Sequence, residues 1–397
     1  MSSTMLKLTT HTVENKTCIT VSSDENDSGS TIKTETTIIA DVSGSMGTSA
    51  DTGTENTGLS VLDLVKHGAK TIIHSKKDGD RIALIAFSTT AYVVCEMTDN
   101  KDELLAAVDK LNPTATTNIY DALTLARKIS NTSSINTNKT IMFLTDGDPN
   151  IEPPRGTIPQ FQKDLEDSQM ENIPFTTFVF GYNAKIHCMD SAAKLTNGSY
   201  VFIPDANFIG TAFINALANN MTTSHTDATV SVSIDDLNEG DFEVHGNVNY
   251  TKTAWGLSIP IGNLRFGQAR HIVLSTQKEI KECRLAARNI STNESFNIEV
   301  SVETPRQNLA MVQYFRAKGV EVIENISQKM LNRNLVPANT VLTQFIDEIK
   351  EYLKGKTKHP LKDQLEGLLA DFEGQVKEAI TTIGLNSLPD KKKIRIR

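Results

Sequence analysis

Several features that mark particular protein classes are scarce or missing in this sequence. It has only four cysteines in 397 residues, they are far apart, and none forms a CxxC pair. This spacing argues against a disulfide framework or a structural zinc site as the basis of the fold. No apolar run approaches the roughly 20 residues needed to span a bilayer, and the N-terminus lacks the pattern of a secretory signal. We therefore expect a cytoplasmic protein without a membrane span.

The sequence also lacks an excess of positive charge. Its formal net charge is -8 at pH 7, whereas nucleic-acid binding depends on basic side chains that neutralise phosphates. We therefore expect no nucleic acid among the partners. Hydrophobic residues make up 39% of the chain and charged residues 22%, a balance typical of folded domains. The length suggests two or three of them.

Between Thr34 and Thr223 the sequence alternates between buried strands and amphipathic helices. The predicted strands are apolar runs at Thr36–Asp41, Arg81–Phe87, Thr140–Thr145 and Pro174–Phe180. Segments such as Leu62–Ser75 have apolar residues at helical spacing. Strands that alternate with helices are typical of a doubly wound, Rossmann-like α/β domain. In such a fold, ligands bind at the carboxyl ends of the strands.

The pattern differs on either side of this α/β segment. Short alternating strands follow it and indicate an antiparallel β-sandwich-like domain, and the chain then becomes helical, as in a bundle. The polar start of the chain contains one predicted strand, at Thr17–Ser22. The predicted divisions are an N-terminal strand and polar linker at 1–33, the α/β domain at 34–223, the β domain at 224–304, the helical domain at 305–385 and a basic tail at 386–397.

An acid and two hydroxyls stand at alternating positions directly after the first buried strand of the α/β segment. They are Asp41, Ser43 and Ser45, and Gly44 and Gly47 allow the loop to turn sharply. Hard cations such as Mg²⁺ prefer oxygen ligands in an octahedral array and often keep water molecules. The two serines can offer their hydroxyl oxygens directly, and Asp41 can bind directly or through water.

Two further oxygen donors come from other loops. Thr117 stands at the start of a predicted helix, with Thr117 or Asn118 at its N-cap, and Asp146 follows the strand Thr140–Thr145. Both loops lie at the same edge of a doubly wound sheet. The sequence therefore predicts one divalent metal site made by Asp41, Ser43, Ser45, Thr117 and Asp146, with Mg²⁺ or Mn²⁺ as the cofactor.

This set of residues resembles the metal-ion-dependent adhesion site of the von Willebrand factor A (VWA) family. The family pattern is Asp-x-Ser-x-Ser followed by a distant Thr and a distant Asp, and every element is present in order. The resemblance implies that Ser43, Ser45 and Thr117 are direct ligands and that Asp41 and Asp146 act largely through water. It also implies an open metal position that an Asp or Glu of a protein partner fills.

Other interpretations of the same residues were weighed. The loop could be a metal-free Ser/Gly turn in a purely structural scaffold. A hydrolase nucleophile elbow requires Gly at position 43, where this chain has serine. His187 and His225 could serve as bases, but neither stands in a recognisable triad pattern. A phosphate-binding Gly-x-x-x-x-Gly-Lys-Ser/Thr loop is absent from the sequence.

The segment from Gly262 to Arg270 reads GNLRFGQAR. It resembles the Gly-x-Leu-x-Tyr-Gly-Gln-x-Arg strand junction of the eukaryotic VWA–Vwaint group, in which an A domain precedes a β segment and a helical segment. Phe266 stands where that group often has tyrosine. Gly267 suits a tight turn between two strands, and Arg270 could brace it. No RING, U-box or Hint signature is visible, so neither ligase nor autoprocessing activity is implied.

Together these observations predict a metal-dependent protein–protein interaction module or scaffold. It would bind an acidic side chain of a partner through the divalent cation, and it would not be an enzyme. The alternative is a component of a ubiquitin-pathway or other enzyme assembly, with catalysis supplied by another chain or a missing domain.

Overall fold

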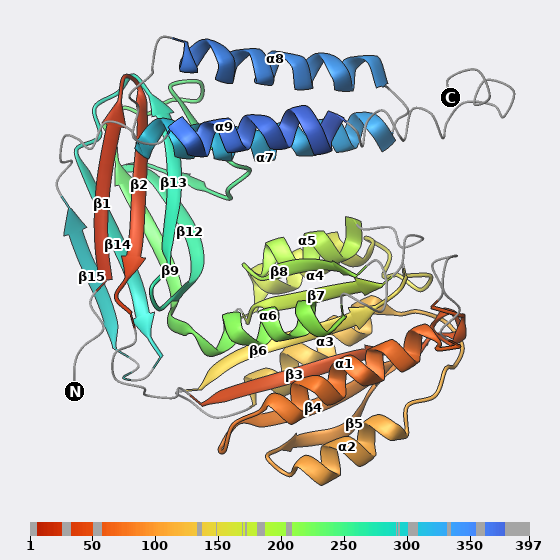
Figure 1. The fold of residues 1–397 in the computed structure, drawn as a ribbon. Coiled ribbons are helices and arrows are strands. Elements are labelled where there is room, and N and C mark those ends of the chain that lie inside the picture. The colour runs from red at the N-terminus through yellow and green to blue at the C-terminus, as the bar shows by residue number, and fades with distance from the viewer. Residues whose placement is uncertain are drawn as a thin grey trace, which may run out of the picture.

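The computed structural model describes residues 6–25, 33–50, 58–132, 137–147, 149–168, 170, 173–180, 187–203, 209–290, 292, 294–300, 309–331, 335–354 and 362–377. These residues form an α/β domain, a pair of antiparallel sheets and a row of C-terminal helices (Figure 1). The antiparallel sheets stand beside the α/β domain, and the C-terminal helices extend from their upper end in this view. Among the described helices, none combines the length and the apolar composition needed to cross a membrane.

The α/β domain is built on a six-stranded sheet with the order β5-β4-β3-β6-β7-β8. Its strands are β3 (Thr34–Asp41), β4 (Arg81–Phe87), β5 (Ala91–Thr98), β6 (Asn138–Thr145), β7 (Phe175–Phe180) and β8 (Ser199–Ile203). All neighbours are parallel except β5, which runs antiparallel to β4 at one edge. The predicted α/β domain is confirmed, with a mixed sheet. Every residue of β3 is buried, as expected for a strand covered on both faces.

Helices cover both faces of this sheet. They are α1 (Val61–Ser75), α2 (Lys101–Asp109), α3 (Ile119–Asn131), α4 (Thr157–Asp167), α5 (His187–Leu195) and α6 (Ile209–Met221). Successive side chains of a strand point to opposite faces. Accordingly, Ile38 packs in the core that contains residues of α1, α2 and α6. Its neighbour Ile39 packs in the core on the side of α3, α4 and α5.

The strand order changes direction at the carboxyl ends of β3 and β6. The first strand of the domain, β3, lies in the middle of the sheet between β4 and β6. Chain connections therefore leave β3 and β6 in opposite directions, which is the arrangement that places ligand sites in α/β proteins. Asp41 is the last residue of β3, and Asp146 directly follows β6.

The second part of the chain consists of two antiparallel sheets that share one core. The four-stranded sheet has the order β1 (Leu6–Val13), β2 (Lys16–Ser23), β13 (Ala269–Thr276), β10 (Phe242–His245). The five-stranded sheet has the order β11 (Thr251–Thr253), β12 (Gly256–Arg265), β9 (Thr223–Ser233), β14 (Glu282–Asn289), β15 (Ser295–Val300). Leu8 and Ile19 from the first sheet pack in the same cluster as Val230 and Leu257 from the second, which makes the pair a sandwich.

The N-terminal segment differs from its prediction. One strand followed by a polar linker was expected over 1–33, but two strands form. β1 pairs with β2, and β2 pairs with β13 through partners such as Ile19 and Ile272. These two strands therefore belong to the sandwich, although the whole α/β domain separates them from it in sequence. The reason is that Leu6, Leu8 and Val21 supply apolar side chains to the sandwich core.

The C-terminal helices pack against the sandwich. They are α7 (Leu309–Leu331), α8 (Leu335–Leu353) and α9 (Lys362–Asp371), followed by a π-helical turn, η3 (Phe372–Val376). Cys18 of β2 and Val273 of β13 share a core with Phe315 and Phe345 of the helices. The outer face of the four-stranded sheet thus serves as one wall of the helical core. The predicted basic tail, 386–397, lies outside the described residues.

The turn predicted at Gly267 is present between β12 and β13. Gly267 has φ +66°, a conformation that favours glycine, and its N–H donates to the carbonyl of Asp24 over 3.2 Å. Arg270 donates from Nη1 to the carbonyl oxygen of Ile261 at 3.0 Å, so it braces the connection between these two strands, which belong to different sheets. Gly262, earlier on β12, approaches Asn197 of the α/β domain.

Candidate metal centre

The loop after β3 is held in place by its own buried residues. Asp41 and Ser43 are almost fully buried, and the side chain of Met46 is anchored in the core. The short 3₁₀ helix η1 (Gly44–Gly47) follows, closed by a hydrogen bond from the Met46 N–H to the carbonyl of Ser43 at 3.1 Å. This turn leaves Ser45 exposed.

Two hydrogen bonds fix the orientation of the Asp41 carboxylate. The backbone N–H of Ser43 donates to Oδ1 at 2.7 Å, and the hydroxyl of Thr145 donates to Oδ2 at 2.5 Å. Burial and, to a smaller extent, the nearby Asp146 carboxylate raise the pKa of Asp41 to about 6, against the lowering effect of these hydrogen bonds. The protein therefore holds a carboxylate at a position that disfavours negative charge.

The hydroxyls of the loop connect Asp41 to Asp146. Ser43 Oγ lies 3.1 Å from Ser45 Oγ, and Ser45 Oγ donates to Asp146 Oδ1 at 2.9 Å. Burial also raises the pKa of Asp146, while the hydrogen bond from Ser45 lowers it. Four of the five predicted ligands are thus brought together in one continuous chain of polar contacts.

The loop that carries Thr117 lies against the loop after β3. Gly44 N–H donates to the carbonyl of Ala115 at 3.1 Å, and Thr114 N–H donates to the carbonyl of Val42 at 2.6 Å. Thr117 is 5% exposed. A Cβ on Gly44 would meet the Ala115 oxygen at 3.2 Å, so glycine at this position permits the close approach of the two loops.

The start of α3 also fixes the loop that carries Thr117. Asn118 is the N-cap, as predicted, and its side-chain oxygen accepts from the N–H of Asp121 at 3.2 Å. The Asp121 carboxylate accepts from the N–H of Ala91 at 2.7 Å. These contacts tie the loop to the β4–β5 turn and orient it.

Sequence reasoning missed two residues that support the site. Thr145 orients Asp41, as described above, and Asn150 accepts the Thr117 N–H on its side-chain oxygen at 2.7 Å. In return, Asn150 N–H donates to the carbonyl of Thr117 at 3.0 Å. A hydroxyl beside Asp146 at a strand end was a usable signal for Thr145. Asn150 has no comparable local signal, because its partner is on another loop.

The five predicted ligands fit a hard divalent cation. They offer hydroxyl and carboxylate oxygens, which are the donors that Mg²⁺ prefers. No basic side chain contributes to the pKa of Asp41 or Asp146, so within the described residues their negative charge has no cationic partner. A bound cation would offset the cost of keeping two carboxylates close together and partly buried.

His225, one of the two histidines considered as bases, does not join this site. His225 is fully buried on β9 in the sandwich. Its ring nitrogens lie 3.1 Å from Ser224 Oγ and 3.3 Å from Asn289 Nδ2. Ser224 is itself 1% exposed, so this Ser–His pair has no access to a substrate. The side chain of His187 and residue Asp148 lie outside the described part of the chain.

Comparison with known proteins identifies the α/β domain. Residues 36–148 match the family model described as von Willebrand factor type A domain. The chain therefore contains a VWA domain, which is generally a protein-interaction module. A search of curated proteins by sequence gives no match.

Two solved structures share the fold over most of the chain. A von Willebrand factor type A protein from Catenulispora acidiphila has a TM-score of 0.64 at 16% sequence identity, with 92% of this chain and 87% of that chain covered. The ArnB paralog VWA2 from Sulfolobus acidocaldarius has a TM-score of 0.58 at 15% identity, covering 96% and 97%. Both likenesses extend well beyond the α/β domain, so a similar overall fold occurs in other VWA proteins.

Proposed function

We propose that the VWA domain binds one Mg²⁺ or Mn²⁺ ion at Asp41, Ser43, Ser45, Thr117 and Asp146, and that this site captures an acidic side chain of a protein partner. The observation that carries the proposal is the buried Asp41 carboxylate, which lies near Asp146 and a set of hydroxyls and has no basic partner among the residues that the structure describes. When bound, the ion supplies a positive charge with an open coordination position, which attracts a carboxylate.

The residues of the chain have separate tasks in this proposal. Ser43, Ser45 and Thr117 hold the ion through their hydroxyls, and Asp41 and Asp146 face it largely through water. Few charged ligands then touch the ion, so its positive charge is only partly neutralised and favours an incoming carboxylate. The exposure of Ser45 supports an opening toward solvent on that side.

The proposal extends to the group of VWA proteins and to the cellular compartment. The strand junction from Gly262 to Arg270 and the order of the three parts support membership in the VWA–Vwaint group. None of the four cysteines forms a disulfide, which supports a reducing, cytoplasmic setting. The proposal gives the chain no reaction of its own and makes it a scaffold or interaction module.

Metal binding is tested first, by titrating the metal-stripped chain with Mg²⁺ and Mn²⁺ in a calorimeter. We expect one site per chain in the native sequence and loss of the heat in Ser45→Ala and Asp41→Ala. Thr116→Ala is the matched control, because Thr116 is adjacent to Thr117 but its hydroxyl lies 2.8 Å from that of Thr89 at the surface. If the native chain binds neither Mg²⁺ nor Mn²⁺, the proposed metal site is wrong.

Partner capture is tested by affinity pull-down in Mg²⁺ and in EDTA. The specific partners are those retained by the native chain and Thr116→Ala in Mg²⁺, and lost both in EDTA and in Ser45→Ala. Substituting Asp and Glu residues of such a partner then identifies the carboxylate that meets the ion. Partners that bind equally well in EDTA would contradict a metal-dependent function.

A further inference from the structure

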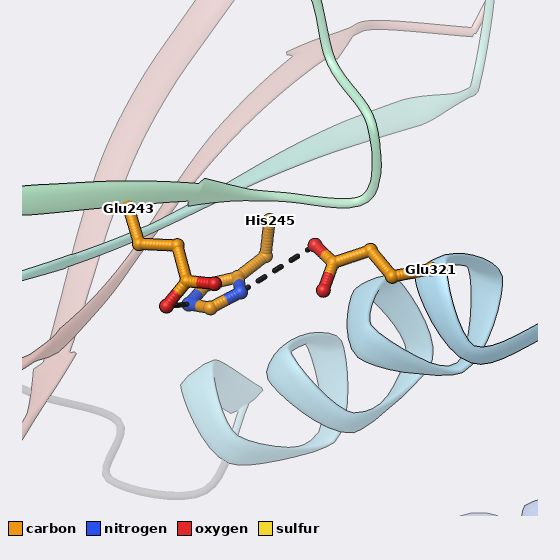
Figure 2. A group of neighbouring side chains, drawn as sticks. All are labelled: Glu243, His245 and Glu321. Atoms are coloured by element: carbon orange, nitrogen blue, oxygen red, sulfur yellow. Dashed lines mark ion pairs between the residues drawn. The ribbon is translucent and has the colours of Figure 1, made fainter. Parts of the chain in front are cut away.

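A second group of potential metal ligands lies between the sandwich and the C-terminal helices. Glu243 and His245 belong to β10, and Glu321 belongs to α7 (Figure 2). Each residue offers one possible ligand atom, and these three atoms all lie within 4.8 Å of one another. We call these three residues the His245 cluster. It is separate from the five residues of the VWA site and comes from different domains.

His245 is a buried side chain with an unsatisfied nitrogen. Only 3% of the residue is exposed. Its Nε2 atom lies 2.7 Å from Ser275 Oγ, but its Nδ1 atom has no hydrogen-bond partner. The ring is fixed edge-on against Tyr314, with centroids 4.9 Å apart. A buried polar atom without a partner destabilises the folded state, so the lack of a partner for Nδ1 among the described residues indicates a ligand.

The spacing of the cluster suits a metal better than a hydrogen bond. His245 Nδ1 lies 3.6 Å from Glu321 Oε1, and Nε2 lies 3.8 Å from Glu243 Oε2. Both distances exceed those of real hydrogen bonds. Two ligands on one tetrahedral ion with bonds of about 2.0–2.2 Å lie about 3.4 Å apart, close to the separation of Nδ1 and Oε1. Figure 2 shows both carboxylates directed toward the imidazole.

The cluster is also supported by neighbouring groups. Gly246 N–H donates to Glu321 Oε1 at 2.6 Å, which holds the carboxylate beside the imidazole. If Nε2 carries the proton and donates it to Ser275, the lone pair of Nδ1 points into the cluster. A histidine ligand whose other ring nitrogen donates to a neighbouring acceptor is a common arrangement around protein-bound metals.

We propose that the His245 cluster binds Zn²⁺ through His245 Nδ1 and the carboxylates of Glu321 and Glu243, with water in the remaining position. One imidazole with two carboxylates suits Zn²⁺, whereas Mg²⁺ and Ca²⁺ prefer oxygen donors alone. The Glu243 carboxylate lies beside Nε2, whereas Glu321 lies beside Nδ1. Because the Glu243 side chain is 68% exposed, it can turn toward an ion at Nδ1 and become the third protein ligand. The bound ion would connect β10 to α7 and fasten the C-terminal helices to the sandwich.

The test uses the full chain with the VWA site disabled by Ser45→Ala and with all metal removed. Zn²⁺ is titrated by calorimetry, bound zinc is counted after gel filtration, and thermal unfolding is followed. We expect one Zn²⁺ per chain and a raised Tm, and neither effect with Mg²⁺ at the same concentration. Zinc binding in this background cannot arise from the intact VWA site, so the two sites are tested separately.

Variants of the cluster identify the ligands. In the Ser45→Ala background, His245→Gln and Glu321→Gln are each expected to weaken Zn²⁺ binding at least ~10-fold. Glu321→Gln retains an oxygen that can accept from Gly246, so it preserves the fold even if His245→Gln does not. Glu239→Gln, at a nearby exposed acid, is the control and should bind as its parent does.

Two outcomes would overturn the proposal. One is a parent chain that binds no Zn²⁺. The other is unchanged zinc binding in both His245→Gln and Glu321→Gln. The second result would mean that Zn²⁺ binds elsewhere in the chain. Cys188→Ser then tests whether the least buried of the four thiols is a zinc ligand.

Discussion

The hydroxyl of Thr145 donates to Oδ2 of Asp41 over 2.5 Å and joins the ends of β6 and β3, although the two residues are 104 positions apart. Both side chains are fully buried. The bond holds the central carboxylate of the VWA site in one orientation before any ligand arrives. It therefore links the stability of the α/β domain to the geometry of the site.

Replacing Thr145 with valine should test that link. The change keeps the shape of the side chain but removes a donor to a buried carboxylate. At pH 8 Asp41, with its pKa of about 6, is ionised. We expect the free energy of unfolding in urea to fall by about 1.5–3 kcal/mol. The control Thr116→Val should change it by less than ~0.5 kcal/mol. Equal effects of the two variants would mean that Ser43 alone holds Asp41.

Magnesium should stabilise the chain by mass action. A ligand that binds only the folded state adds about 2.7 kcal/mol to the unfolding free energy at a concentration of 100 times its Kd. We expect this gain in the native chain and in Thr116→Ala, measured by chemical denaturation at a series of Mg²⁺ concentrations. Ser45→Ala should show none of it. If the unfolding free energy of the native chain does not change with Mg²⁺ concentration, the prediction is contradicted.

His225 should make the sandwich sensitive to acid. Burial lowers its pKa from 6.5 to about 4, and its neighbours Ser224, Asn289 and Phe296 carry no charge. As the pH falls below 6.5, His225 becomes protonated in the unfolded chain. In the folded chain it stays neutral until about pH 4. Stability is therefore lost across this window, by up to about 3 kcal/mol from this residue.

The effect of His225 is separated from that of the other titrating groups by comparing variants. The unfolding free energy is measured from pH 7 to pH 4 for the native chain and for His225→Gln. We expect a smaller decline in His225→Gln. His67→Gln, which alters an exposed histidine of α1, should decline as steeply as the native chain. If all three curves are parallel, His225 does not control the acid sensitivity.

Glycine at position 262 should be required for stability, because this position lies where the sandwich meets the α/β domain. It has φ +70°, and a Cβ there would lie 2.8 Å from Asn197 Cβ. Gly240 also has a positive φ, +94°, but a Cβ there would meet nothing within 4 Å. Alanine at Gly240 should cost about 1–2 kcal/mol of strain. Gly262→Ala should cost about 1–3 kcal/mol more, because the two domains must shift apart.

A double variant checks the cause of the Gly262 effect. Asn197→Gly removes the atom that a new Cβ at position 262 would strike. In a double-mutant cycle followed by thermal unfolding, Asn197→Gly should recover most of the extra loss in Gly262→Ala and none of the loss in Gly240→Ala. Purely additive effects at positions 197 and 262 would show that backbone strain alone explains the loss.

Part of the candidate site could be predicted because its signals are local. Asp41, Ser43 and Ser45 stand together in the sequence, and Thr117 and Asp146 each occupy a recognisable end of an element. The doubly wound pattern also predicted that these ends share one edge of the sheet. The orienting roles of Thr145 and Asn150 were not predicted, because each depends on a partner in a different loop.

The sequence by itself determined many elements of this protein, although not β1, since apolar periodicity and loop residues act over a few positions. It gave the buried strand that ends at Asp41, the capped helix at Asn118 and the turn at Gly267. Only the tertiary structure decided which elements pair. β2 joins β13 across the intervening α/β domain, and β10 meets α7 at His245. Such pairings depend on which apolar faces and polar groups are still uncovered after the local elements have formed. No short stretch of sequence contains that information.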